Sequence, residues 1–270
     1  IRSVVDSYDG QRTTVGEVYI LSTRRVAEYY GDGDELHMSF NFPPLHAPWD
    51  AAAWRVRIER VVESFDPREA WPTWVLSNHD VRRHRTRYGS EARARAAAVL
   101  LLGLRGTPFL YAGEELGLED AAIPPGRALD PGGRDGCRAP LPWDEAPDHG
   151  WATEDPWLPW PPEPEDRNVA VARGDEHSIL HLYRRLLAAR RDSPALSAGA
   201  FAWIDSPEGV LAWRRQADGD ERVVVVSFVD DDTRVTIEGS WTIEVSTERA
   251  REGTTFDGRL APDEALVLHR

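Results

Sequence analysis

The chain has 270 residues, with 46 acidic against 32 basic residues and a net charge of −14 at pH 7. This negative charge argues against nucleic acid as a partner, because a phosphate backbone binds basic surfaces. No apolar run approaches the roughly 20 residues of a membrane span, so we expect no membrane partner. The single cysteine, Cys137, excludes an internal disulfide and is compatible with a reducing, cytoplasmic location.

The first 42 residues predict one helix and two strands, with an irregular segment between the strands. Apolar residues at helical spacing predict a helix over residues 1–8. β-Branched residues predict a strand over 13–20, in which Gly16 and Glu17 are central. Residues 19–33 lack periodicity and are expected to be irregular, and residues 36–42 are the next predicted strand.

Two helices follow. An apolar stripe predicts a helix over 49–65, with Asp50 as its N-cap. Residues 91–104 are rich in Ala, Arg and Leu and form the clearest predicted helix. A short strand is expected over 107–111.

Between those helices lies the stretch WVLSNHD, residues 74–80, which is the most informative in the chain. A short apolar run that stops at an amide, an imidazole and a carboxylate is typical of a buried parallel strand whose end faces a ligand. The alternative is a strand followed by an ordinary polar turn.

The second half of the chain changes character. Residues 116–164 are rich in Pro, Gly and Trp, and the tryptophans favour an ordered excursion. A helix capped by Asp175 or Ser178 is expected to run to Arg191. After residue 196, short β-rich runs separated by turns predict a small antiparallel domain.

Strand and helix alternate four times before this all-β tail. Alternation predicts a parallel sheet, either half of an eight-unit barrel or a small open sheet. We therefore expect two domains, residues 1–195 and 196–270. In a barrel the carboxyl ends of the strands share one mouth, which would bring Glu17, the polar end of residues 74–80 and Glu114 together. Carboxylates gathered in that way suit glycoside hydrolysis, although for an isolated Gly-Glu pair such as Gly16-Glu17 a surface position on an edge strand is commoner.

Five motifs occur in one order: VGEV (15–18), HMSFNF (37–42), SNHD (77–80), GTPFLYAGEE (106–115) and GRDGCRAPLPWD (133–144). Together they resemble the α-glucosidase and oligo-1,6-glucosidase branch of the α-amylase family, glycoside hydrolase family 13. The resemblance covers nearly the whole chain. It implies an α/β fold: the C-terminal half of a (β/α)8 TIM barrel, strands five to eight, followed by a small antiparallel β-domain.

The resemblance also implies roles for five residues. Glu17 would be the general acid/base, and Asp80 the carboxylate that holds sugar hydroxyls in the distorted transition state. His79 would hydrogen-bond the same sugar ring. Arg138 would help to close the pocket around the non-reducing glucose, and Arg83 is a weaker candidate for substrate binding. No cofactor or metal ion is implied.

Two points are open at this stage. Arg138 could instead form a structural ion pair with Asp135 or Asp144. The family's nucleophile, an aspartate after a Gly-Phe-Arg type motif, has no counterpart, and Asp257 in the β-tail is no substitute. A retaining mechanism needs that nucleophile about 5 Å from the acid. We therefore expect the chain to be inactive alone and to pair with an N-terminal half of the same enzyme.

The main functional hypothesis is thus the C-terminal part of a retaining, exo-acting α-glucosidase, with an α-glucoside oligosaccharide as substrate. One alternative is a relative that transfers glucosyl groups or isomerises sucrose or maltose. The other is a non-catalytic sugar-binding or scaffold protein.

Overall fold

Four short parallel strands form the first part of the fold in a computed structural model, which describes residues 1–270. They are β1 (Val15–Gly16), β2 (Met38–Ser39), β3 (Thr73–Val75) and β4 (Thr107–Phe109). β1 pairs with β2 and β3 pairs with β4, both in parallel. The Thr73 hydroxyl joins the two pairs, since it donates to the Ser39 carbonyl at 2.8 Å and accepts from the Asn41 N–H at 3.1 Å.

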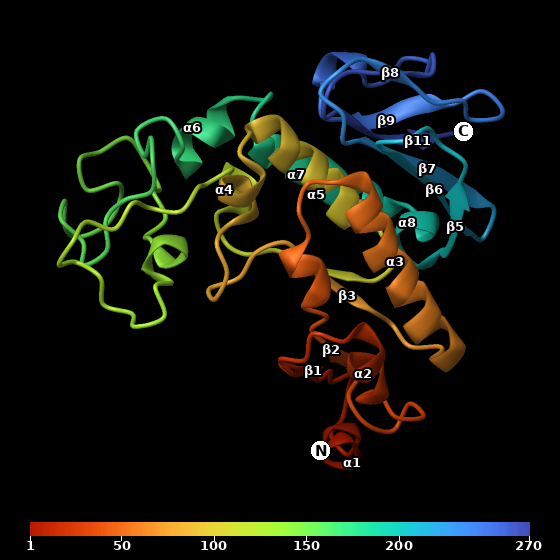
Figure 1. The fold of residues 1–270 in the computed structure, drawn as a ribbon, viewed down its shortest axis with the longest axis horizontal. Coiled ribbons are helices and arrows are strands. Elements are labelled where there is room, and N and C mark those ends of the chain that lie inside the picture. The colour runs from red at the N-terminus through yellow and green to blue at the C-terminus, as the bar shows by residue number, and fades with distance from the viewer.

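The fold contains eight α-helices. They are α1 (Arg2–Asp6), α2 (Thr23–Glu28), α3 (Ala51–Phe65), α4 (His84–Tyr88), α5 (Glu91–Gly103), α6 (Val169–Gly174), α7 (Ile179–Asp192) and α8 (Pro194–Ala198). Single 3-10 turns are η1 (Pro43–His46), η2 (Asp66–Arg68), η3 (Glu114–Leu116), η4 (Asp135–Arg138) and η5 (Arg249–Arg251). In Figure 1, α3, α5 and α7 lie in the middle of the molecule, and α1, α2, β1 and β2 form its N-terminal end.

The C-terminal part is a five-stranded antiparallel sheet in the order β5-β6-β7-β11-β9. Its strands are β5 (Ala200–Ile204), β6 (Val210–Ala217), β7 (Asp220–Ser227), β9 (Thr242–Ser246) and β11 (Ala265–His269), and a small ladder pairs β8 (Thr233–Arg234) with β10 (Arg259–Leu260). One core joins this sheet to the helices, because Trp213 and Val224 belong to the same buried cluster as Leu100 and Leu186. The indole of Trp213 donates to the Gly103 carbonyl at the end of α5.

The long excursion between β4 and α6 is ordered and has almost no regular structure. It contains only η3 and η4, and it extends to one side of the molecule in Figure 1. Within this excursion the Trp151 indole donates to the Leu141 carbonyl at 2.7 Å, and Asn168 caps α6 by accepting from the Val171 N–H.

The predicted elements are confirmed in kind, with three corrections. Residues 19–33 contain helix α2, which packs on α3 through the fully buried Val26 and Ala27. The strands predicted over 13–20 and 36–42 are each only two residues long. α6 and α8 were not predicted, and α8 crosses the boundary expected at 195/196, which stays a prediction. No helix of the fold is long and apolar enough to span a bilayer.

Candidate functional site

The end of β3 turns sharply at Asn78 and presents two polar side chains. The chain is buried through Ser77, and the Asn78 side chain then accepts from the N–H groups of Asp80 and Val81 at 3.0 and 2.9 Å. An asparagine that bonds the backbone two and three residues on fixes a tight turn. His79 is consequently exposed and Asp80 is half-buried. The predicted strand with a polar end is confirmed.

Asp80 lies in a cluster with two arginines. Its Oδ1 accepts from Arg134 Nη1 at 2.7 Å and from Arg138 Nη2 at 3.1 Å. Its Oδ2 lies 3.5 Å from His79 Nε2. One carboxylate oxygen is therefore held by guanidinium groups, while the other faces an exposed imidazole.

Asp130 completes the cluster and fixes Arg134. It accepts from the Arg134 backbone N–H, from Nε at 2.8 Å and from Nη2 at 2.6 Å. These hydrogen bonds hold the pKa of Asp130 well below its usual range and raise that of Arg134. Two carboxylates and two guanidinium groups thus form a compact ion-pair network with no net charge, which we call the Asp80 cluster (Asp80, Asp130, Arg134 and Arg138).

Arg138 forms ion pairs with Asp80 at 3.1 Å and with Asp130 at 3.8 Å, and not with Asp135 or Asp144 as the alternative expected. Asp135 is buried and accepts the backbone N–H groups of Leu129 and Asp130, and it makes no ion pair with Arg138. Arg138 instead contacts Asp80, and its Nε donates to the His79 carbonyl at 2.8 Å. Arg138 therefore stabilises the turn that carries His79 and Asp80 by bonding to both residues.

Arg83 lies beneath the cluster. It is 3% exposed, its Nη1 donates to the Ala112 carbonyl at 2.8 Å, and its guanidinium carbon lies 4.6 Å from the centre of the Tyr111 ring. The Tyr111 hydroxyl donates to the Cys137 carbonyl at 2.9 Å, and burial raises the pKa of this tyrosine. Arg83 thus contacts the segment after β4 and, through Tyr111, the stretch that carries Arg138, and its predicted contact with a substrate stays a prediction.

Glu17 is placed differently from Asp80. It follows β1 directly and is exposed, and its side chain makes no hydrogen bond or ion pair. The residue before it, Gly16, packs against Leu36, since a Cβ there would lie 2.4 Å from Leu36 Cδ1 and that side chain would have to shift. No contact joins Glu17 to the Asp80 cluster, so its predicted role is untested by the geometry.

Arg134 and Asp130 were not predicted as site residues. Arg134 was visible as the first arginine of the stretch RDGCR, which also contains Arg138. Asp130 had no comparable signal, because a single Asp-Pro pair in a Pro- and Gly-rich loop is typical of a turn.

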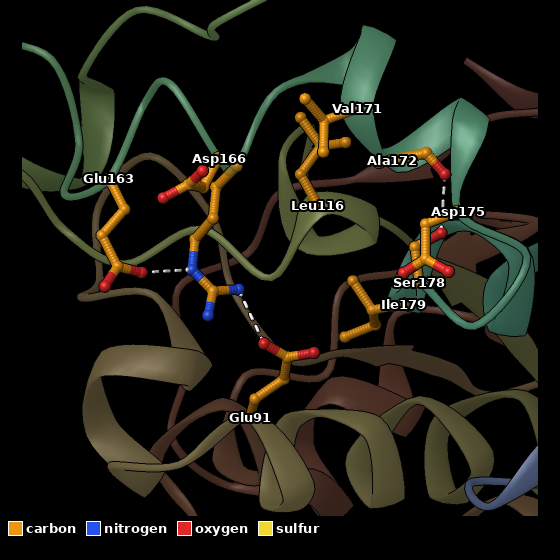
Figure 2. Close-up of a pocket in the computed structure, with 10 residues that line it drawn as sticks. Glu91, Leu116, Glu163, Asp166, Val171, Ala172, Asp175, Ser178 and Ile179 are labelled. Atoms are coloured by element: carbon orange, nitrogen blue, oxygen red, sulfur yellow. Dashed lines mark hydrogen bonds and ion pairs between the residues drawn. The ribbon is translucent and has the colours of Figure 1, made fainter.

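A separate cavity of about 220 Å³ lies between α5, α6, α7 and η3. Arg167, which lines this cavity, pairs with Glu163 at 2.9 Å and with Glu91 at 2.7 Å, and Figure 2 labels these two glutamates. None of the predicted site residues lines it. No group of three or more His, Cys, Asp or Glu in the chain is arranged to hold a metal ion.

Comparisons with known proteins place this geometry in context. The family model described as the catalytic domain of alpha-amylase matches residues 1–199. A probable alpha-glucosidase of Rhizobium meliloti (strain 1021) is 38% identical over 222 residues, which are 77% of this chain and 40% of that protein.

Two solved structures are also similar. The structure of XgtA, an alpha-glucosyl transfer enzyme, has a TM-score of 0.86 and 34% identity and covers 100% of this chain and 53% of its own. Trehalulose synthase MutB from Pseudomonas mesoacidophila MX-45 has a TM-score of 0.82 and 26% identity, with 98% and 56% covered. This chain spans about half the length of the proteins that it matches.

Proposed function

Because the chain belongs to the alpha-amylase family, we propose that it is part of a retaining, exo-acting α-glucosidase. The substrates would be maltose- or isomaltose-type oligosaccharides, cleaved at the non-reducing end. The observation that carries the proposal is the Asp80 cluster. Two guanidinium groups hold Oδ1 of Asp80, so the carboxylate is fixed in one orientation while a third of its side chain stays open to a ligand.

In this proposal the parallel strands β1 to β4 are barrel strands five to eight. Glu17, at the end of β1, is the general acid/base that protonates the leaving oxygen. Asp80 accepts hydrogen bonds from sugar hydroxyls, strongest in the distorted transition state, and His79 contacts the same ring. Arg138 closes the pocket, where a rigid bidentate donor suits a ring with adjacent hydroxyls.

The nucleophilic carboxylate of this proposed reaction is supplied by a segment outside these 270 residues. The N-terminal end of the fold supports such a partner. Ile1, Val4 and Tyr19 have 87%, 58% and 63% of their surface exposed, and β1 pairs on one side only. Apolar side chains beside an unpaired strand edge form a surface suited to a further strand–helix unit of the same enzyme.

The test compares the chain alone with a fusion. The 270-residue chain is expected to leave a chromogenic α-glucoside intact. Fused behind the N-terminal segment of the Rhizobium meliloti relative, it is expected to hydrolyse the substrate and release α-glucose, as proton NMR of the first product would reveal. Glu17→Gln in the fusion should lower kcat/KM by about 10²- to 10⁴-fold. Glu28→Gln, an exposed glutamate on α2, is the matched control.

Robust turnover by the chain alone would contradict the account of the nucleophile. An active fusion that tolerates Glu17→Gln would contradict the role of Glu17.

Glucosyl transfer or isomerisation is the second candidate, and the similarity to XgtA and MutB favours it. Product analysis of the same fusion with sucrose and with maltose separates the reactions, since hydrolysis releases glucose and transfer or isomerisation yields a new disaccharide or trisaccharide. A non-catalytic sugar-binding protein would bind maltose in calorimetry of the complete assembly without consuming it.

A further inference from the structure

Behind the turn at Asn78 lies a buried polar group that the proposed reaction does not use. Ser77 and His84 are each 1% exposed. The Ser77 oxygen accepts from the His84 backbone N–H at 2.8 Å and lies 3.0 Å from His84 Nδ1. These two hydrogen bonds close the loop from Ser77 to His84, which contains His79 and Asp80.

Glu114 of η3 reaches this group from the other side. It is 2% exposed, and its Oε1 lies 3.8 Å from His84 Nδ1. Neither carboxyl oxygen makes a hydrogen bond of good geometry. The backbone of Glu114 is fixed, since its N–H donates to the Tyr111 carbonyl at 2.9 Å. A glutamate in such a place is either an unpaired buried charge or a neutral acid.

The charges nearby do not turn this group into an ion pair. Burial raises the pKa of Glu114 to about 8. Burial first, and then the guanidinium groups of α4, lower the pKa of His84 to about 3. The nearest cation, Arg83, donates to the Ala112 carbonyl instead of to Glu114. Both side chains therefore favour their neutral forms at pH 7.

The groups that face this pair come from four elements. They are Ser77 after β3, Arg83, Arg85, Arg87 and Tyr88 around α4, Tyr111 and Glu115 beside η3, and Tyr183 of α7. Burial and the charge of Glu115 raise the pKa of Glu114, whereas the Tyr111 backbone, the Ser77 hydroxyl and the charge of Arg83 lower it. Desolvation is the largest of these effects for Glu114.

We propose that Glu114 is a neutral carboxylic acid at pH 7 and that, with Ser77 and His84, it is a positioning residue for the turn that presents His79 and Asp80. An ionised Glu114 would be the strongest hydrogen-bond acceptor in the group. The Ser77 hydroxyl or the His84 imidazole would then turn toward it, and the hydrogen bond between Ser77 Oγ and His84 Nδ1, one of the two that close the loop, would be lost. The protonated carboxyl leaves that bond intact.

The importance of this positioning role for catalysis rests on the proposed function, because only in that proposal does Asp80 contact a sugar. The protonation of Glu114 and its effect on the turn are independent of any substrate. The experiment therefore measures these two properties on the 270-residue chain without a ligand.

The first measurement is the infrared difference spectrum between the wild type and Glu114→Gln from pH 5 to pH 10. The wild type is expected to show the C=O stretch of one protonated carboxyl at pH 7 that Glu114→Gln lacks, and this band should titrate away around pH 8. Glu115→Gln, next in the chain, is the matched control and should keep the band. A wild type with no such band at pH 7 would overturn the proposal.

The second measurement is amide hydrogen exchange at Asp80 and Val81, whose N–H groups bond to Asn78. After correction for the intrinsic rate, their protection should fall at least fivefold in the wild type between pH 7 and pH 9. Glu114→Gln, which mimics the neutral acid, should keep it. An equal fall in Glu114→Gln would overturn the positioning role. If no α-glucoside binds the chain in any assembly, the proposed function fails, while both measurements retain their meaning.

Discussion

The Asp263 side chain connects the C-terminal part to Trp49, which precedes α3, and to Arg93 of α5 through two hydrogen bonds. Its Oδ1 accepts from the Trp49 indole at 2.6 Å and its Oδ2 accepts from Arg93 Nε at 3.0 Å, across 214 and 170 residues of sequence. The side chain is only 10% exposed, so water does not replace these partners easily. Asp263 also has a φ of +50°, which asparagine and aspartate tolerate better than alanine.

Asp263→Ala should therefore remove two hydrogen bonds, one of them between charged groups, and leave the indole N–H of the half-buried Trp49 without this acceptor. A loss of this kind costs about 2–3 kcal/mol, and the left-handed backbone adds about 1 kcal/mol. The expected loss of unfolding free energy is thus about 3–4 kcal/mol, measured by urea denaturation followed by tryptophan fluorescence. Asp263→Asn keeps one acceptor and the backbone preference and should cost about half as much.

Asp218→Ala is the matched control. Asp218 also has a φ of +50°, but it is exposed in a turn and its side chain makes no hydrogen bond, so it isolates the backbone cost. A double-mutant cycle with Trp49→Phe should show a coupling of about 1 kcal/mol between the indole and the carboxylate. If Asp263→Ala costs no more than Asp218→Ala, the reasoning from the two hydrogen bonds is refuted.

Three further predictions concern other parts of the fold. Gly103→Ala would place a Cβ 2.9 Å from both methyl groups of Val224, at the contact between α5 and the sheet. It should therefore lower the unfolding free energy by about 1–2 kcal/mol, despite the better helix propensity of alanine. A stabilised variant would show that Val224 can move to accommodate the methyl group. Asp50→Ala removes the acceptor for the Ala53 N–H at the start of α3 and should cost about 1 kcal/mol in urea denaturation, with Asp50→Asn restoring most of it; equal losses in the two variants would contradict a capping role. Burial raises the pKa of Glu114 to about 8 in the folded chain, above its ordinary value of about 4.3, so between these values the folded state binds one more proton than the unfolded state. The wild type should therefore lose stability relative to Glu114→Gln as pH rises from 5 to 8, by up to about 1.4 kcal/mol per pH unit. A pH-independent difference in urea titrations would argue against this protonation.

The long helices could be predicted from the sequence because their signals are local. α3 and α5 begin after Asp50 and Ser90, whose side chains accept the N–H groups expected of N-caps, and each predicted helix agrees with the observed one within two residues. The strands β1 and β2 are shorter than predicted because they pair with each other over only two residues. β-Branched residues favour strands, but pairing partners decide how far a ladder extends.

Elements that depend on distant contacts were beyond the sequence. α2 has no side-chain cap and is six residues long, and its buried residues pack on α3, more than twenty residues away. The same limit applies to the site. Arg138 and Asp80 are 58 residues apart, and no local pattern says that Arg138 contacts Asp80 while Asp135 bonds to backbone N–H groups. The family resemblance predicted that both residues belong to the site, but not that they touch.

The two carboxylates of the proposed reaction differ in how many contacts orient their side chains. Asp80 is oriented by Asn78 through its backbone and by Arg134 and Arg138 through its side chain, all within these 270 residues. Glu17 follows a two-residue strand and has no side-chain partner. A catalytic acid needs neighbours that fix its orientation and raise its pKa into the working range. If Glu17 has the proposed role, those neighbours must come from outside the present contacts of β1. The segment that supplies the nucleophile would then also complete the surroundings of the acid, and the loss of either would remove both functions together.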